Sequence, residues 1–188
     1  MLSLNSTTKQ FLFTSDAHFG HKNILEYDKR VFSDIKVHDN CLIDNWNVAV
    51  DPTDVVFYLG DFALCNIHYA ESIMARLNGE KYFIRGNHDK RDMVKLYERY
   101  GTYLGEQCKI EINGQKIVLN HYAMLVWDES HHGAWQLHGH SHGNLTYPYI
   151  QKQLDVGINI WDYEPIRFDV IKLIMDKIPV KPIDHHGE

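Results

Sequence analysis

Short apolar runs recur along the chain, and each one stops abruptly at a polar residue. The runs and the polar residues after them are 11–14 before Ser15-Asp16, 55–59 before Gly60-Asp61, 81–84 before Arg85-Gly86-Asn87-His88, 116–119 before Asn120-His121, and 135–137 before His138-Gly139-His140. The first four are short, rich in β-branched and aromatic residues, and bounded by turn residues, which predicts buried strands.

Helical periodicity separates the early runs. Residues 38–48 have a rough helical period, and residues 67–77 a clear one that stops at Asn78-Gly79. Asp89 is suited to cap a third helix that continues through Tyr97. The order β-α-β-α-β-α predicts a parallel core with right-handed crossovers.

After Gly101 the pattern becomes mostly β. Residues 108–120 alternate around Asn113-Gly114, which predicts a hairpin. Residues 165–178 are ambiguous, although their apolar spacing favours a final helix. We therefore expect an α/β fold in one domain over residues 1–188, with a loose tail at about 179–188.

The composition limits the class of protein. Of the 188 residues, 44% are hydrophobic and 23% charged, which is typical of a soluble globular chain. The net charge of −6 disfavours a long duplex as partner, because proteins that grip nucleic-acid backbones are usually basic. Bound metal ions would still let an acidic protein act on nucleotides.

The same sequence argues against export and membrane insertion. Residues 1–10 are polar, and no apolar run approaches the length of a bilayer span, so we expect neither a signal peptide nor a membrane partner. Cys41, Cys65 and Cys108 form no C-x-x-C pair, and three sparse thiols suit a reducing cytoplasm.

The polar endings of the runs carry the candidate chemistry. Ligand sites of parallel sheets lie beyond the carboxyl ends of the strands, so we expect these endings to share one site. Asp16 and His18 are two positions apart and would point the same way in extended backbone, as would His140 and His142. Asp61 is suited to bridge two cations through its two oxygens.

The polar residues after the other apolar runs add two further candidate metal ligands. Asn87 offers a neutral carbonyl oxygen, and His121 an imidazole. A set of imidazole, carboxylate and amide ligands without thiolate suits Mn, Fe, Zn, Ni or Co, and manganese is our first expectation. Two such cations clamp a phosphoryl group and turn a bridging water into hydroxide. His88 would then give a proton to the leaving oxygen, and Asp89 would orient His88 or cap the helix.

The ordered set D-x-H, G-D, G-N-H-D, H and G-H-x-H, from Asp16 to His142, resembles the calcineurin-like metallophosphoesterase superfamily. The segments around Asp16 and His140 are similar to its small bacterial and phage members. The resemblance implies a four-layer α/β/β/α sandwich with a dinuclear metal site and His88 as the general acid. It implies one metal held by Asp16, His18, Asp61 and His142, and a second held by Asp61, Asn87, His121 and His140.

These observations lead us to expect a metal-dependent phosphoesterase. We favour a phosphodiester substrate, such as a nucleotide or a short nucleic-acid end. The alternatives are a phosphomonoesterase, a protein phosphatase, and a non-catalytic scaffold with this fold, which would typically have lost ligands. The oligomeric state has no signature in the sequence.

Several nearby residues keep two interpretations. His21 and Arg85 would either touch the substrate or belong to the surface, Arg85 in an ion pair. The segment 122–137, with Trp127, His131 and His132, would be a lid over the substrate or a surface loop with an aromatic side chain tucked beneath it.

Overall fold

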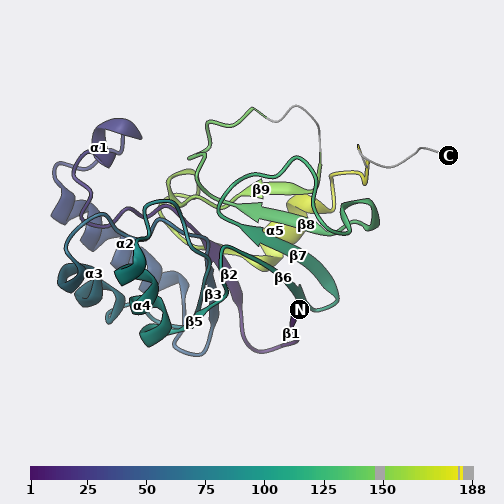
Figure 1. Ribbon diagram of the computed structural model, residues 1–188, viewed down its shortest axis with the longest axis horizontal. Helices are drawn as coiled ribbons and strands as arrows, with labels where there is room; N and C mark the ends of the chain where they lie inside the picture. The colour runs from purple at the N-terminus through teal and green to yellow at the C-terminus, as the bar shows by residue number, and fades with distance from the viewer. Residues whose placement is uncertain (147–150, 182, 184–188) are drawn as a thin grey trace.

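The computed structural model describes residues 1–146, 151–181 and 183, and contains two five-stranded sheets that pack face to face (Figure 1). The predicted α/β class is confirmed. The first sheet has the order β10 (Ile166–Arg167), β2 (Phe11–Thr14), β3 (Val55–Tyr58), β4 (Glu80–Phe83) and β5 (Thr102–Tyr103). The second has the order β1 (Leu2–Leu4), β6 (Gln107–Ile112), β7 (Gln115–Asn120), β8 (Trp135–His138) and β9 (Gln153–Asp155).

The strands that precede the polar endings run parallel within each sheet. β2, β3, β4 and β5 pair in parallel, as do β7, β8 and β9, whereas β10 and the β6–β7 hairpin are antiparallel. The carboxyl ends of β2, β3 and β4 therefore meet at one edge of the first sheet, and those of β7 and β8 at one edge of the second.

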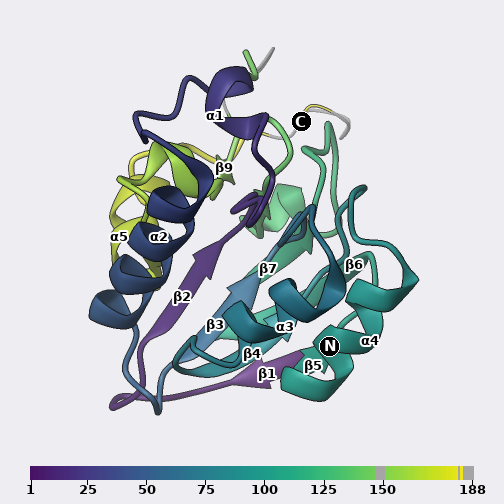
Figure 2. The same ribbon diagram turned by 90° about the vertical axis from the view of Figure 1, so that its left-hand side faces the viewer.

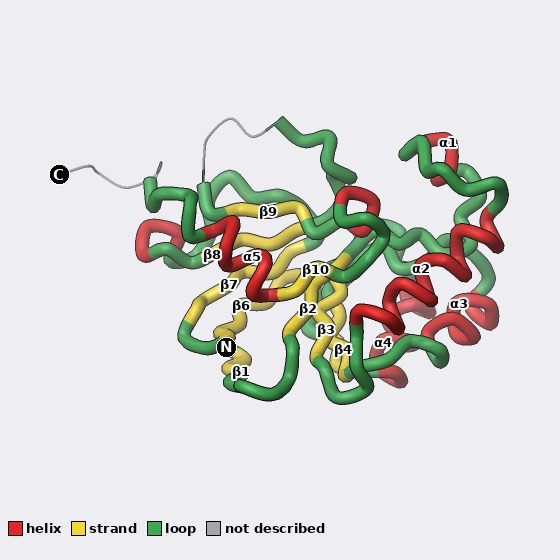
Figure 3. Tube along the Cα trace, turned by 180° about the vertical axis from the view of Figure 1, so that it is seen from behind, coloured by secondary structure: helices red, strands yellow, loops and turns green. Residues whose placement is uncertain are grey.

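Helices cover one face of the first sheet (Figure 2). They are α2 (Ile35–Ala49), α3 (Ile67–Met74) and α4 (Arg91–Tyr100). The short α1 (Ile24–Tyr27) projects from the body of the molecule (Figure 1). α5 (Phe168–Met175) follows β10 directly and lies beside the sheets (Figure 3), and the 3-10 turns are η1 (Ser130–His132) and η2 (Ile158–Ile160).

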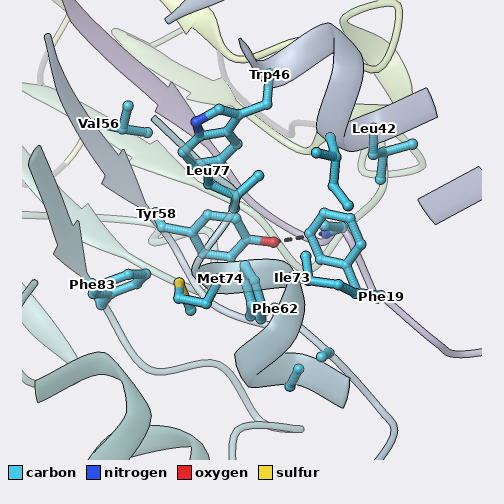
Figure 4. Close-up of a cluster of buried hydrophobic side chains, with 14 of the residues drawn as sticks. Phe19, Leu42, Trp46, Val56, Tyr58, Phe62, Ile73, Met74, Leu77 and Phe83 are labelled. Carbon is cyan, nitrogen blue, oxygen red and sulfur yellow. Dashed lines mark hydrogen bonds between the residues drawn. The ribbon is translucent and has the colours of Figure 1, made fainter. Parts of the chain in front are cut away.

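Two apolar cores explain why the first-sheet strands are apolar on both faces. Leu12, Val56 and Tyr58 face the helices, where Trp46 and Phe62 pack around Tyr58 (Figure 4). The intervening residues of β2 and β3 face the second sheet, and the rings of Phe13 and Phe57 stack there with centroids 5.2 Å apart. Strands buried on both faces read as continuous apolar runs, as parallel strands usually do.

The helix boundaries differ from the predictions for local reasons. α2 begins at Ile35 rather than at residue 38, because the Asp34 side chain accepts hydrogen bonds from the N–H groups of Lys36 and Val37. α3 ends at Met74, three residues before the predicted end, in a tight turn closed by the Leu77 N–H to Met74 carbonyl bond.

Asp89 is not the cap of α4, and that prediction was wrong. The helix starts at Arg91 with Lys90 at the cap position, because the Asp89 carboxylate is taken up by the site loops. The predicted hairpin is confirmed, with Asn113 and Gly114 at φ 49° and 82° in its turn. The final helix is also confirmed but is shorter, since the residues before it form β10.

Two further sequence predictions concern the ends and the membrane. Residues 182 and 184–188 of the predicted loose tail lie outside the described residues. Among the helices that the structure describes, none is both long enough and apolar enough to cross a bilayer.

Candidate metal centre

The loops after the predicted strands are joined to one another by backbone hydrogen bonds. The N–H groups of Asp16 and His18 donate to the carbonyls of Gly60 and Asp61, at 3.0 and 3.1 Å, which ties the loop after β2 to the loop after β3. The N–H of His140 donates to Asp16 Oδ2 at 2.9 Å and so connects the two sheets. The polar endings therefore form one cluster.

The backbone of this cluster is left-handed rather than extended. Asp16, His18, Asp61, His140 and His142 have φ values of 58°, 53°, 58°, 65° and 49°. The extended backbone assumed for both pairs was therefore wrong, because each strand has already ended. Asp16 and His18 nevertheless converge on one group of donor atoms. Such conformations cost about 1–3 kcal/mol each in residues other than glycine, and they concentrate at functional sites.

Two glycines allow the loops to approach this closely. A Cβ added to Gly139 would overlap Asp16 Oδ2 and Ser15 Oγ, and one added to Gly86 would overlap the Asp61 carboxylate. Both positions therefore need a residue without a side chain.

Asp16, His18 and His142 form what we call the first donor group. One ligand atom from each lies within 4.8 Å of the others. Asp16 Oδ1 is 3.6 Å from His142 Nε2 and 4.0 Å from His18 Nε2. Asp16 Oδ1 and both ring nitrogens of His18 are buried, and none has a hydrogen-bond partner among the described residues. Buried polar atoms without partners call for an explanation, and a bound cation would supply it.

The second donor group comprises Asp61, His121 and His140, which meet the same 4.8 Å limit, together with Asn87. His121 Nε2 is 3.4 Å from Asp61 Oδ2 and 2.9 Å from Asn87 Oδ1. His121 Nδ1 donates to the Leu59 carbonyl at 2.8 Å, which turns Nε2 toward the centre of the group. Backbone acceptors commonly orient metal-ligating histidines in this way.

Burial and neighbouring charges shift the pKa values of the clustered aspartates and histidines. Burial raises the pKa of Asp16 to about 6 and lowers the pKa of His18 to about 3. Burial also acts to lower the pKa of His121. Its hydrogen bond to Asp61 and the charges of Asp16 and Asp61 outweigh burial and raise that pKa to about 9. The pKa of His142 is raised as well, because the charges of Asp28 and Asp16 and a hydrogen bond to Asp28 outweigh its burial.

His88 and His21 lie at the mouth of the cluster. The His88 side chain is 41% exposed, with Nε2 4.0 Å from Asp61 Oδ2. The ring centroid of His21 is 5.5 Å from that of His18 and 6.4 Å from that of His88. Both histidines therefore flank the donor groups, which keeps the substrate-contact interpretation of His21 open.

Asp89 lies behind the cluster and is fully buried. Its carboxylate accepts hydrogen bonds from the N–H groups of Asp61, Phe62 and Gly86, at 2.9, 3.2 and 2.8 Å. Asp89 therefore holds the loop that carries Asp61, a role that the sequence did not suggest.

Two supporting residues were missed altogether. Asp28 Oδ2 lies 2.6 Å from His142 Nδ1, and Arg30 is buried beside Asp28 at 2.9 Å. In the sequence Asp28-Lys29-Arg30 looks like a run of exposed charges. Only the spatial proximity of Asp28 to His142, 114 positions away, reveals their role.

A pocket of about 270 Å³ opens beside the second donor group. It is lined by Arg85, Gly86, Asn87, Glu106, Asn120, His121 and Tyr122. Arg85 forms an ion pair with Glu106 at 3.0 Å. This is the surface ion pair that the sequence offered as the alternative to substrate contact. The ring of Tyr122, 47% exposed, packs edge-on against His140.

The segment after Tyr122 is attached to the outer face of the second sheet. Trp127 is buried against Val118 and Ala134, and its ring N–H donates to the Ala134 carbonyl at 2.9 Å. A buried aromatic ring beneath the segment is what the surface-loop interpretation of residues 122–137 predicted.

Comparison with known proteins gives relatives but no activity. No protein-family model matches the chain. The uncharacterized protein MJ1445 of Methanocaldococcus jannaschii is 35% identical over 177 residues, which cover 90% of this chain and 93% of that protein. The Gene 66 protein of Mycobacterium phage L5 is 30% identical over 193 residues, which cover 86% and 92%.

A solved structure supports the fold. The protein of unknown function AQ665 from Aquifex aeolicus superposes with a TM-score of 0.69 at 22% identity, covering 89% of this chain and 100% of that one. This likeness concerns the arrangement of sheets and helices alone.

Proposed function

We propose that this chain, which belongs to the same family as the uncharacterized protein MJ1445 and the phage L5 Gene 66 protein, is a dinuclear metal-dependent phosphoesterase of the calcineurin-like type. The observation that carries the proposal is the adjacency of the two donor groups. Asp61 Oδ2 lies 3.4 Å from His121 of its own group and 3.7 Å from His18 of the other. A carboxylate in that position is suited to contact two cations at once.

The proposed architecture is the four-layer α/β/β/α sandwich. α2, α3 and α4 would form one outer layer over the first sheet. On the other side, the segment that carries Trp127 packs on the outer face of the second sheet. α5 instead packs Ile171 and Met175 into the core between the sheets, with its Phe168 ring 5.5 Å from Trp135.

The residues present fit two divalent cations. Asp16, His18, Asp61 and His142 would hold one, and Asp61, Asn87, His121 and His140 the other. Asp16 Oδ1 and His18 Nε2 support this assignment, because both are buried and neither has a hydrogen-bond partner in the described part of the chain. The imidazole, carboxylate and amide donors suit manganese first, with Fe, Zn, Ni or Co as alternatives. When bound, two such cations neutralise phosphate charge and lower the pKa of water to near neutrality.

The chain's own groups would complete the reaction. His88 projects at the mouth of the cluster and would give a proton to the leaving oxygen, a contribution of about 10²–10⁴-fold. The backbone N–H of His88 donates to Asp61 Oδ1 at 2.8 Å, so the loop that presents the proposed acid also holds the shared carboxylate. Asp89 would keep that loop in place from behind.

We favour a small phosphodiester as substrate, such as a nucleotide or a short nucleic-acid end. The pocket of about 270 Å³ is small, and the exposed ring of Tyr122 at its rim offers a stacking surface for a base. The net charge of −6 disfavours long duplexes. Monoester hydrolysis is the second candidate, because His88 is available to protonate a basic leaving group.

The test uses the full chain stripped with chelator and assayed on bis-p-nitrophenyl phosphate and p-nitrophenyl phosphate. Mn²⁺, Ni²⁺, Zn²⁺ and Mg²⁺ are each added back. His68→Ala, an exposed histidine on α3, is the matched control for histidine variants of the site. Metal-restored hydrolysis supports the proposal, and the diester-to-monoester ratio assigns the substrate class. Absence of turnover with every metal would reject the enzyme and favour the binding scaffold.

A further inference from the structure

A buried arginine lies directly behind the first donor group. Arg30 is only 4% exposed, and its guanidinium donates to the carbonyls of Asp16 and Ala17, both at 2.8 Å. It also grips Asp28 Oδ2 through Nε and NH2, at 3.1 and 2.9 Å. One side chain thus contacts both the loop of Asp16 and His18 and the carboxylate that contacts His142.

Asp28 fixes the orientation of His142. Its Oδ2 lies 2.6 Å from His142 Nδ1, which directs Nε2 toward Asp16 Oδ1 at 3.6 Å. A carboxylate behind a ligating histidine sets the tautomer and increases its basicity, and loss of such a partner typically costs 10–100-fold in metal affinity.

The other end of the guanidinium determines the tautomer of a second histidine. Arg30 NH1 lies 2.8 Å from His38 Nε2, and since arginine only donates, Nε2 must accept. His38 Nδ1 then carries the proton and donates to Asp39 Oδ1 at 2.8 Å. Asp39 in turn accepts from the N–H of Gly20. The 16–20 loop is therefore held at its start by Arg30 and at its end by Asp39.

The second donor group is held by different residues. His121 is oriented by the Leu59 carbonyl, and the Asp61 loop by Asp89. We propose that Asp28 and Arg30 form a positioning unit for one metal only, setting the affinity of the first donor group and leaving that of the second unchanged. This inference rests on the proposed function.

The experiment measures metal binding by the full chain. Asp28→Asn, Arg30→Lys and Arg30→Gln are compared with wild type by calorimetric Mn²⁺ titration and by metal content after gel filtration. Lysine keeps the charge of Arg30 but lacks the planar fork that reaches Asp28 and two carbonyls together. Lys81→Gln is the control, because Lys81 is a similarly buried cation whose ammonium binds the carbonyls of Leu77 and Gly79, away from the cluster.

We expect the Asp28 and Arg30 variants to keep one tight equivalent of Mn²⁺ and to bind the other about 10–100-fold more weakly. The Mn²⁺ concentration for half-maximal hydrolysis should rise by a similar factor, with kcat recovering at saturating metal. Lys81→Gln should melt earlier and still bind both equivalents. Adding Asp28→Asn to His142→Ala should weaken binding no further, because both changes act on one ligand.

Other results separate the two proposals. If wild type binds two metals and the Asp28 and Arg30 variants do so with unchanged affinity, the positioning inference fails and the proposed function stands. Equal weakening of both equivalents would also overturn it, since a general loss of structure acts on both. A wild-type chain that binds no metal and hydrolyses no ester would overturn both proposals together.

Discussion

Asp61 Oδ2 lies 3.7 Å from His18 Nε2, so a carboxylate of the second donor group meets a histidine of the first. The two residues come from loops after adjacent parallel strands, and the His18 N–H to Asp61 carbonyl bond locks those loops together. The two donor groups are therefore adjacent parts of one cluster of side chains.

The first prediction concerns this shared carboxylate. Asp61→Asn removes one charge and one anionic oxygen from both proposed metal sites, so we expect both Mn²⁺ equivalents to weaken and hydrolysis to fall to background. Metal content and activity measured on the same sample test this. The control is Asp44→Asn, an exposed carboxylate on α2. Retention of two tight equivalents by Asp61→Asn would rule out the bridging role.

The second prediction concerns the proton donor. p-Nitrophenolate is a weakly basic leaving group and needs little protonation, whereas a nucleoside alkoxide needs much. His88→Ala should therefore lower kcat/KM about 10²–10⁴-fold on a dinucleotide or a nucleoside monophosphate, and less on nitrophenyl esters. His68→Ala should change neither. Equal losses of kcat/KM on both kinds of substrate would instead indicate that His88 positions the phosphate.

The third prediction concerns Gly139. A Cβ there overlaps Asp16 Oδ2 and Ser15 Oγ, so Gly139→Ala must displace the Asp16 side chain. We expect loss of Mn²⁺ binding at the first donor group. Gly114→Ala is the control, because it strains a hairpin turn with φ 82° and meets no atom within 4 Å. Gly114→Ala should lower the melting temperature and leave Mn²⁺ binding intact. Equal Mn²⁺ affinity of the Gly139→Ala and Gly114→Ala variants would contradict the steric argument.

The fourth prediction concerns the hydroxyl of Tyr58 in the helix-side core (Figure 4). It accepts a hydrogen bond from the buried Ala17 N–H at 2.9 Å, within the Asp16–His18 loop. Tyr58→Phe leaves that N–H unpaired and should lower the free energy of unfolding by about 1–3 kcal/mol. Urea denaturation measures this. Tyr82→Phe removes an exposed hydroxyl that donates to Glu80 and should change stability by less than about 0.5 kcal/mol. Equal effects would argue against a special role for the Tyr58 hydroxyl.

The amino-acid sequence by itself determined the strands, the hairpin and the gathering of polar residues at one edge. These follow from local patterns, since a short apolar run such as 55–59 predicts a strand wherever it lies. Because parallel strands end on the same side, Asp16, Asp61 and His121 were expected to meet, and the structure brings them together. Their role as metal ligands remains a prediction.

Tertiary structure alone decided how those residues are held. The left-handed residues Asp16 and His140 are joined by a hydrogen bond between the two sheets, a contact that no local pattern encodes. Asp89 was expected to cap a helix or to orient His88. Its carboxylate instead accepts a hydrogen bond from the buried N–H of Asp61, 28 positions away. The pairing of Asp28 with His142 spans 114 positions, and only the packing of the loops around Arg30 brings the two side chains within hydrogen-bonding distance.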